Sequence, residues 1–314
     1  MYENHFGLTE KPFTLTPNPR FLFLSRTHQE ALAHLRYGLE SRVGFIAVSG
    51  EVGTGKTTIL RSLFDHFAGT RYRLAVVFNP CLTPLELLRG INREFGLPAH
   101  GESALALIDE LNRFLLDENH AGRTPVLVID EAQNLAPAVL EQIRLLSNLE
   151  TDADKLIQIV LVGQPELDLL LDRSDLRQLA QRIAVRCRLE PLNRDETRGY
   201  VRHRLEIAGV YGELFDRSAL DEVFAWTGGL PRLINRLCDR ALLCAYTSNS
   251  YHVSLLDVCQ AAKELEQAET RPKGFEAVTS RVRSLLAGER LYLILGLATL
   301  LEIFVLLWLV GVLV

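Results

Sequence analysis

The eight residues GEVGTGKT, from Gly50 to Thr57, constrain this chain more than any other part of its sequence. They fit the pattern GxxxxGK[ST], follow an apolar run at 44–49 and lead into a helical pattern at 56–68. Glycines let successive backbone N–H groups turn towards phosphate oxygens, and a helix N-terminus adds partial positive charge. The sequence therefore predicts a strand, a phosphate-binding loop and a helix in this order.

The predicted loop assigns roles to its polar side chains. Lys56 is expected to reach the β- and γ-phosphates of ATP, and the hydroxyl of Thr57 is expected to ligate Mg²⁺. ATP and Mg²⁺ are thus the expected ligands. The residues expected to bind the nucleotide are Gly50, Glu51, Val52, Gly53, Thr54, Gly55, Lys56, Thr57 and Thr58.

Short apolar runs alternate with helical patterns before Pro191. The runs are 44–49, 73–78, 125–129, 157–163 and 184–189, and the helical patterns are 56–68, 83–95, 103–119, 137–149 and 175–182. The middle runs are almost continuous Val, Ile and Leu, as in strands that are buried on both faces. We therefore predict an α/β fold with a parallel sheet that is covered by helices on both sides.

Composition divides the chain into five segments. We expect an N-terminal arm and a helix capped by Thr27 in 1–43, a nucleotide-binding domain in 44–191, an all-helical lid domain in 192–268, a polar linker in 269–290 and a membrane segment in 291–314. The arm is rich in proline, which disfavours helix in the residue before it.

The segment 291–314 is almost wholly apolar, with Glu302 as its one charged residue. A run of this length can cross a hydrocarbon layer of roughly 30 Å. Arg281, Arg283 and Arg290 precede it, and the positive-inside bias places the N-terminal part in the cytoplasm. The sequence predicts a single-pass transmembrane helix that contacts a membrane partner, with a buried interface helix as the alternative.

Net charge and cysteine usage narrow the function classes. The formal net charge of −5 argues against coating nucleic acid by bulk charge, although a local basic patch stays possible. Cysteines stand at Cys81, Cys187, Cys238, Cys244 and Cys259, with no CxxC spacing, so reduced thiols are expected. The start of the chain lacks the pattern of a secretory signal.

Acidic and amide side chains follow two of the apolar runs. Asp130 and Glu131 end the run at 125–129; Asp130 is expected to hold Mg²⁺, and Glu131 to polarise the attacking water. Gln164 follows the run at 157–163 and could orient the same water, because an amide both donates and accepts. The alternatives are solvated acids at a strand end and a turn residue.

Arginine is expected at two places around the phosphates. Arg182 lies just before the last strand, where it could project into the γ-phosphate site of a neighbouring subunit. Arg177, Arg186 and Arg188 are rivals for this role, and a surface salt bridge is the alternative for each. Arg232 opens a helix after Gly-Gly-Leu-Pro and would point back to the nucleotide from the lid.

These parts, in this order, resemble the AAA+ ATPases. The arm with Phe6-Gly7-Leu8, Pro12-Phe13 and Pro17 to Phe23, the helix with His28 and Ala31, Gly44-Phe45 before the loop, and Val162 to Leu167 are similar to the general secretion pathway protein A family (the ExeA type). That family also resembles the ATPases that regulate DNA transposition. The resemblance implies a five-stranded sheet in the order 5-1-4-3-2 and a homo-oligomer, a ring or arc with ATP between subunits, at the bacterial inner membrane.

Three functions are consistent with these features. The favoured hypothesis is a membrane-tethered ATP hydrolase that assembles or remodels a secretion, pilus or polysaccharide-export machine. The alternative is an ATP-dependent, DNA-binding regulator of the transposition type, which the acidic net charge disfavours. A nucleotide-dependent scaffold is disfavoured by the intact Glu131.

Overall fold

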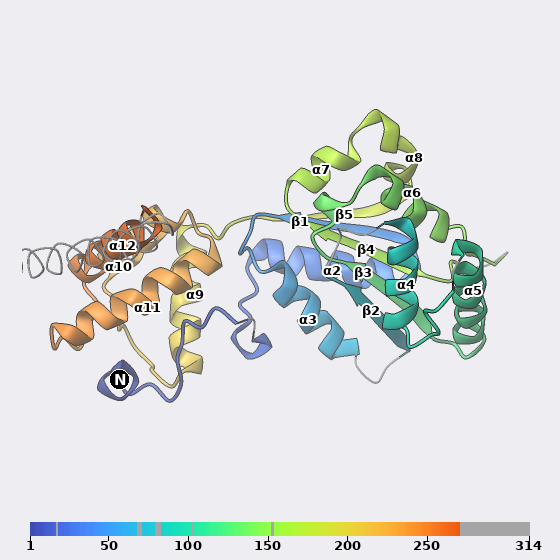
Figure 1. Cartoon of the computed structure of the whole chain (residues 1–314). Helices are drawn as coiled ribbons and strands as arrows, with labels where there is room; N and C mark the ends of the chain where they lie inside the picture. Colours follow the sequence, from blue (N-terminus) through green and yellow to red (C-terminus); the bar gives the residue numbers. More distant parts are fainter. Residues whose placement is uncertain (17, 68–70, 79–82, 102, 152–153, 271–314) are drawn as a thin grey trace, which may run out of the picture. The chain divides into compact units, whose positions relative to one another are not determined.

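The strand that leads into the loop lies inside a five-stranded parallel sheet of the computed structural model (Figure 1). Its strands are β1 (Phe45–Gly50), β2 (Tyr72–Val77), β3 (Thr124–Ile129), β4 (Gln158–Gly163) and β5 (Ile183–Leu189). Each begins and ends within one residue of its predicted run. The order from the β2 edge is 2-3-4-1-5. The expected listing, 5-1-4-3-2, starts from the β5 edge and names the same neighbouring pairs.

The structure describes residues 1–16, 18–67, 71–78, 83–101, 103–151 and 154–270. Within these ranges, no helix combines the length and the apolar character that a membrane crossing requires. This finding contradicts the predicted transmembrane helix and the predicted single-pass location in the inner membrane. The segment 291–314, on which those predictions fell, lies outside the described residues.

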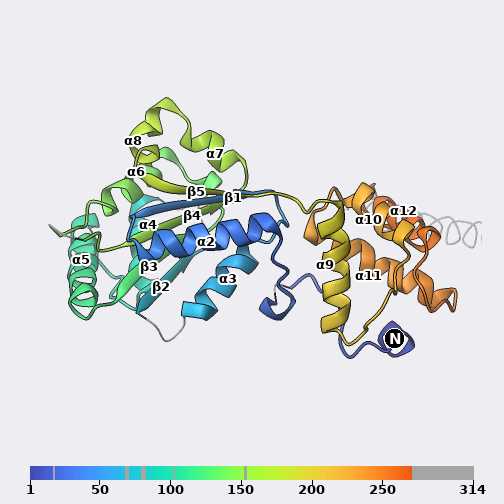
Figure 2. The same cartoon turned by 180° about the vertical axis from the view of Figure 1, so that it is seen from behind.

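One face of the sheet is covered by α2 (Arg26–Glu40) and α3 (Lys56–Phe67) (Figures 1 and 2). Successive strand residues point to opposite faces, so Ile46 and Val48 of β1 pack against these two helices. Ser25, not the predicted Thr27, caps α2, because its hydroxyl accepts from the N–H of His28.

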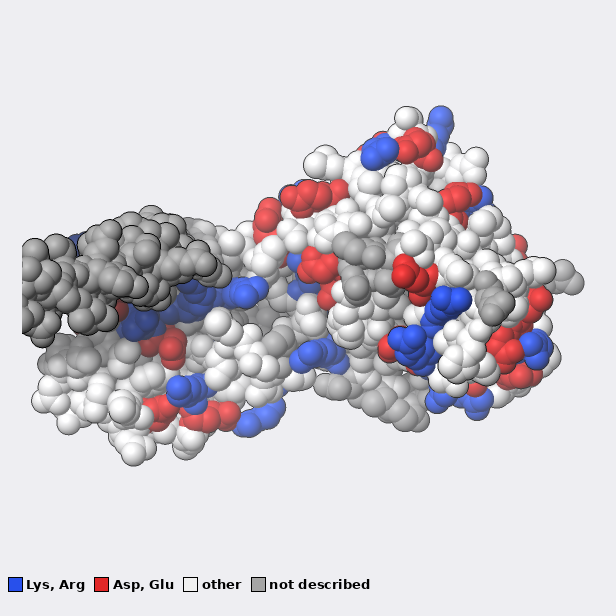
Figure 3. Space-filling view, in the orientation of Figure 1, with Lys and Arg blue, Asp and Glu red and all other residues white. Residues whose placement is uncertain are grey.

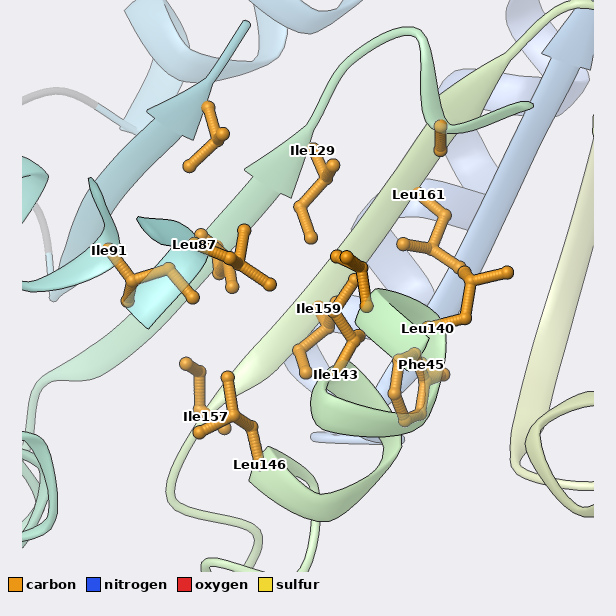
Figure 4. Packing of buried hydrophobic residues seen from close by; sticks show 14 of the residues in the cluster. Phe45, Leu87, Ile91, Ile129, Leu140, Ile143, Leu146, Ile157, Ile159 and Leu161 are labelled. Carbon is orange, nitrogen blue, oxygen red and sulfur yellow. The ribbon is translucent and has the colours of Figure 1, made fainter. Parts of the chain in front are cut away.

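The other face packs against α4 (Pro84–Glu94), α5 (Ala104–His120), α6 (Pro137–Leu146) and α7 (Glu166–Leu171). Figure 4 shows Leu140, Ile143 and Leu146 of α6 beside Ile159 and Phe45 of the sheet. A capping box between Thr83 and Glu86 starts α4. The predicted helix at 175–182 is two short helices, η3 (Ser174–Leu176) and α8 (Arg177–Ala180). Buried apolar side chains thus hold both faces of the sheet rigid around the loop.

The elements described between β5 and residue 270 are all helices: α9 (Arg194–Ile207), α10 (Arg217–Thr227), α11 (Pro231–Thr247) and α12 (Leu255–Thr270). An Asn193–Glu196 capping box starts α9, and Gly228, with φ at 58°, ends α10. Residues Met1–Ala261 form one compact unit. The five predicted segment boundaries stay a prediction.

The N-terminal arm contains more structure than its prolines suggested. It forms α1 (Tyr2–Phe6) and the single-turn helix η1 (Pro19–Phe21). Between them, residues 9–16, here called the strap, bind the C-terminal end of α9: the N–H of Thr9 donates to the carbonyl of Ala208 at 2.8 Å. The strap thereby reaches the site described next.

Candidate active site

One cavity of about 350 Å³ collects most of the predicted site residues. The predicted residues that line it are Val52, Gly53, Thr54, Gly55, Lys56, Thr57, Thr58, Asp130, Glu131 and Arg232. The rest of the wall comes from the strap, the residues that flank η1, α2, the β5–α9 connection, α9 and α11. These lining residues are Thr14, Leu15, Thr16, Asn18, Leu22, Phe23, His28, Leu192, Tyr200, Arg204, Pro231 and Asn235. Gly50, Glu51, Gln164 and Arg182 are not among the lining residues.

The loop turns back over the side chain of Lys56. Its ammonium donates to the carbonyl oxygens of Gly50 at 2.6 Å and Glu51 at 3.0 Å. Gly53 and Gly55 have φ of 87° and 103°, a region that side-chain-bearing residues avoid. Burial lowers the pKa of Lys56, although nearby carboxylates, Glu131 foremost, act in the opposite direction.

Asp130 and Glu131 follow β3 at the same edge of the sheet as the loop. Burial raises the pKa of Asp130, and its Oδ1 accepts from the N–H of Glu131 at 2.9 Å. The backbone of Glu131 is left-handed, with φ at 53° and ψ at 36°. Such a conformation costs about 1–3 kcal/mol in a non-glycine residue and is concentrated at functional sites. The strain is consistent with a carboxylate that must face a fixed direction.

Gln133 is a site residue that the sequence reasoning missed. Its Nε2 donates to Oε2 of Glu131 at 2.7 Å, and its Oε1 accepts from the N–H of Gln164 at 3.0 Å. Gln164 itself donates from Nε2 to the same carboxylate oxygen at 3.1 Å. Hydrogen bonds from Gln133 and then Gln164 lower the pKa of Glu131. The amide of Gln164 therefore lies at the carboxylate of Glu131, and the amide of Gln133 is a second hydrogen-bond donor to it.

The start of α11 packs on the loop. The N–H of Arg232 donates to the carbonyl oxygen of Gly53 at 3.3 Å, and its exposed side chain lines the cavity. Gly229, two residues before α11, packs closely against Leu192: its φ is 76°, and a Cβ there would lie 1.8 Å from the carbonyl oxygen of Leu192. The predicted Arg232 therefore lies beside the predicted loop.

Arg182 lies elsewhere, at the C-terminal end of α6. Its Nη1 donates to Ser147 Oγ at 2.5 Å, to Asn148 Oδ1 at 2.6 Å and to the carbonyl of Arg144 at 3.1 Å. Among the rivals, Arg186 pairs with Asp172 at 2.9 Å. Arg177 and Arg188 are exposed, and their side chains make no hydrogen bond or ion pair to the other described residues. The role of Arg182 between subunits stays a prediction.

Arg204, on α9, is a cavity residue that the sequence did not single out. It is 5 % exposed, and no carboxylate among the described residues pairs with it. Instead, its Nε donates to the carbonyl of Pro12 in the strap, Nη1 donates to the hydroxyl of Tyr200 at 2.8 Å, and the guanidinium lies 4.6 Å from the ring centroid of Phe21. No sequence signal joins residues so far apart along the chain.

Metal binding at this cavity depends on few protein ligands. The described residues contain no group of three or more His, Cys, Asp or Glu side chains that could hold a metal by themselves. Mg²⁺ typically takes one or two protein oxygens together with substrate phosphates and water. Thr57 and Asp130, which both line the cavity, supply a hydroxyl and a carboxylate oxygen and so fit that ion.

The amino-acid sequence matches a family model described as an AAA domain over residues 39–171. It is also 48% identical, over 266 residues, to general secretion pathway protein A of Aeromonas hydrophila. That alignment covers 84% of this chain and 48% of the relative, so the chain spans about half of the relative's length. The resemblance inferred from the motifs is confirmed.

Solved structures share the fold at low identity. Cdc6p from Pyrobaculum aerophilum has a TM-score of 0.59 at 22% identity, covering 83% of this chain and 70% of its own. Drosophila ORC bound to DNA has a TM-score of 0.62 at 19% identity, covering 84% and 65%. The Thermotoga maritima RuvB branch migration motor has a TM-score of 0.53 at 19% identity, covering 77% and 70%.

Proposed function

Since this chain is an AAA+ ATPase, an ATP-hydrolysing P-loop enzyme, we propose that it uses ATP hydrolysis to assemble or remodel a secretion, pilus or polysaccharide-export machine. The observation that carries the proposal is the single cavity shared by the loop, Asp130, Glu131 and Arg232. The name of the 48%-identical relative supplies the link to secretion.

The chemistry at the cavity divides among three groups. Lys56 and the loop N–H groups would bind the phosphates, and Thr57 and Asp130 would hold Mg²⁺, which would neutralise phosphate charge. Glu131, kept ionised by its two amide donors, accepts the proton of the attacking water. Arg232 stabilises the negative charge that spreads over the transferred phosphoryl group.

Glu131→Gln tests the assignment of the base. We expect phosphate release to fall by about 100-fold or more, the usual contribution of a general base, while ATP binding changes little. The matched control is Glu141→Gln on α6, an exposed glutamate that pairs with Arg144. Parent-level hydrolysis by Glu131→Gln would show that another group activates the water.

The same variant tests the client. Affinity capture from cell lysate with Glu131→Gln and ATP is expected to retain subunits of an export or pilus machine, and Lys56→Ala is expected to lose them. On the face shown in Figure 3, Asp and Glu are interspersed with Lys and Arg. If the protein instead binds duplex DNA with an affinity that falls steeply with salt, the transposition-type alternative replaces the machine.

A further inference from the structure

His28 contacts the phosphate-binding loop but belongs to none of the groups assigned above. It lies in the first turn of α2, is 4 % exposed and lines the nucleotide cavity. Its Nε2 lies 2.9 Å from the carbonyl oxygen of Thr54, and its Nδ1 lies 2.5 Å from Oγ of Ser25. Both ring nitrogens therefore have a partner.

The partners determine the tautomer. A carbonyl oxygen can only accept, so Nε2 must carry the proton that it shares with Thr54. In the neutral ring Nδ1 then accepts from the hydroxyl of Ser25, which caps α2. Burial lowers the pKa of His28, in agreement with a neutral imidazole.

The Thr54 carbonyl belongs to the peptide group that also carries the N–H of Gly55. In a trans peptide these two groups point in opposite directions. The hydrogen bond to His28 therefore fixes the direction of the Gly55 N–H, one of the donors expected to hold phosphate oxygens. The contact is close: a Cβ at Gly55 would lie 3.1 Å from His28 Nε2.

We propose that His28 is a positioning residue of the ATP site, which holds the Thr54–Gly55 peptide in its phosphate-binding orientation and ties it, through Ser25, to the start of α2. The side chain need not touch the nucleotide. Its removal leaves a buried carbonyl without its donor and lets the peptide rotate, which weakens ground-state binding of phosphates.

Two substitutions separate the hydrogen bond from packing. His28→Leu fills much of the space but cannot donate, whereas His28→Gln can donate from Nε2. We expect His28→Leu to raise the Kd for ADP and the KM for ATP by about tenfold, the value of one buried hydrogen bond, with kcat within about twofold. His28→Gln should return both constants to within about threefold of the parent. His34→Ala, an exposed histidine on the same helix, is the control and should change nothing.

ADP binding is measured without turnover, so this test is independent of the assignment of Glu131. An unchanged ADP affinity in His28→Leu, with a parent-like melting temperature, would overturn the proposal. So would a His28→Gln variant as weak as His28→Leu. If His28→Leu does not fold, His28→Ala with the same measurements decides between the two outcomes.

Discussion

The N–H of Arg232 and the carbonyl oxygen of Gly53 form a hydrogen bond of 3.3 Å between α11 and the phosphate-binding loop. The backbones come this close because Gly53 lacks a side chain. A Cβ at this position would lie 2.5 Å from the Cβ of Arg232, a distance that real Cβ atoms essentially never show. The φ of 87° at Gly53 independently favours glycine.

Gly53→Ala is therefore expected to damage both stability and nucleotide binding. Backbone strain and the contact with Arg232 should lower the free energy of unfolding by about 1–3 kcal/mol. The Kd for ADP should rise by about tenfold or more, because the loop and α11 can no longer meet. Chemical denaturation and ADP titration measure the two effects.

Gly90→Ala is the matched control. Gly90 lies inside α4, and a Cβ there would have nothing within 4 Å. Alanine is the better helix former, so this change should raise the free energy of unfolding by about 0.5–1 kcal/mol and leave ADP affinity unchanged. Equal effects of the two substitutions would contradict the close approach at Gly53.

The sequence predicted those parts of the site that are local along the chain. The strand, loop and helix around Lys56 form one continuous segment, and Asp130 and Glu131 directly follow a buried strand. A continuous apolar run limits a strand to a narrow range, which explains why each observed strand begins and ends close to its predicted run. The sheet then brings the ends of parallel strands to one edge.

The contacts that the sequence did not predict join residues far apart along the chain. His28 meets Thr54 across 26 positions, and Arg204 meets Pro12 across 192. Gln133 is close to Glu131 along the chain, but its second partner, Gln164, lies on another strand end. Composition and periodicity describe one segment at a time, so they carry no signal for such pairs.

Gln133→Leu should release the carboxylate of Glu131. We expect kcat to fall by about tenfold, because the base loses its fixed orientation, while the Kd for ADP stays unchanged. Phosphate-release kinetics measure this effect. Gln178→Leu, at an exposed glutamine of α8, is the control and should keep the parent kcat. A Gln133→Leu enzyme as fast as the parent would contradict the orienting role.

The same variant has a signed pH effect on stability. Hydrogen bonds from Gln133 and Gln164 depress the pKa of Glu131 in the folded state below its ordinary value of 4.5. They therefore stabilise the fold when the pH is above 4.5. That contribution is lost as the pH falls through the depressed folded-state pKa. The stability difference between parent and Gln133→Leu should therefore be present at pH 7 and shrink below 4.5. Denaturation at a series of pH values measures it.

Mixing experiments test the arginine between subunits. Arg182→Ala keeps its own loop, and Lys56→Ala keeps its own Arg182, so the two defects lie on different subunits of a shared site. If Arg182 acts in trans, an equal mixture should regain about a quarter of the parent activity, because random assembly makes one interface in four intact. Activity that returns only when Arg177→Ala is the partner would transfer the role to Arg177, which is exposed.

Arg204 tests whether the strap is part of the nucleotide site. Arg204→Met keeps the length of the side chain but removes the donors to Pro12 and Tyr200. The unpaired carbonyl of Pro12 costs stability, and removal of a buried charge without a carboxylate partner offsets part of that cost. We expect a net loss of about 1–2 kcal/mol in the free energy of unfolding.

Arg204→Met should destabilise the strap more than it destabilises the fold as a whole. Without its anchor, the strap should exchange its amide hydrogens at residues 9–16 faster, and ADP should bind less tightly because Thr14, Leu15 and Thr16 line the cavity. Arg202→Met is the control, since Arg202 is exposed two positions earlier on the same helix; its effect should stay within about 0.5 kcal/mol. Faster amide exchange in the strap with an unchanged ADP affinity would show that the strap encloses the cavity without contributing to nucleotide binding.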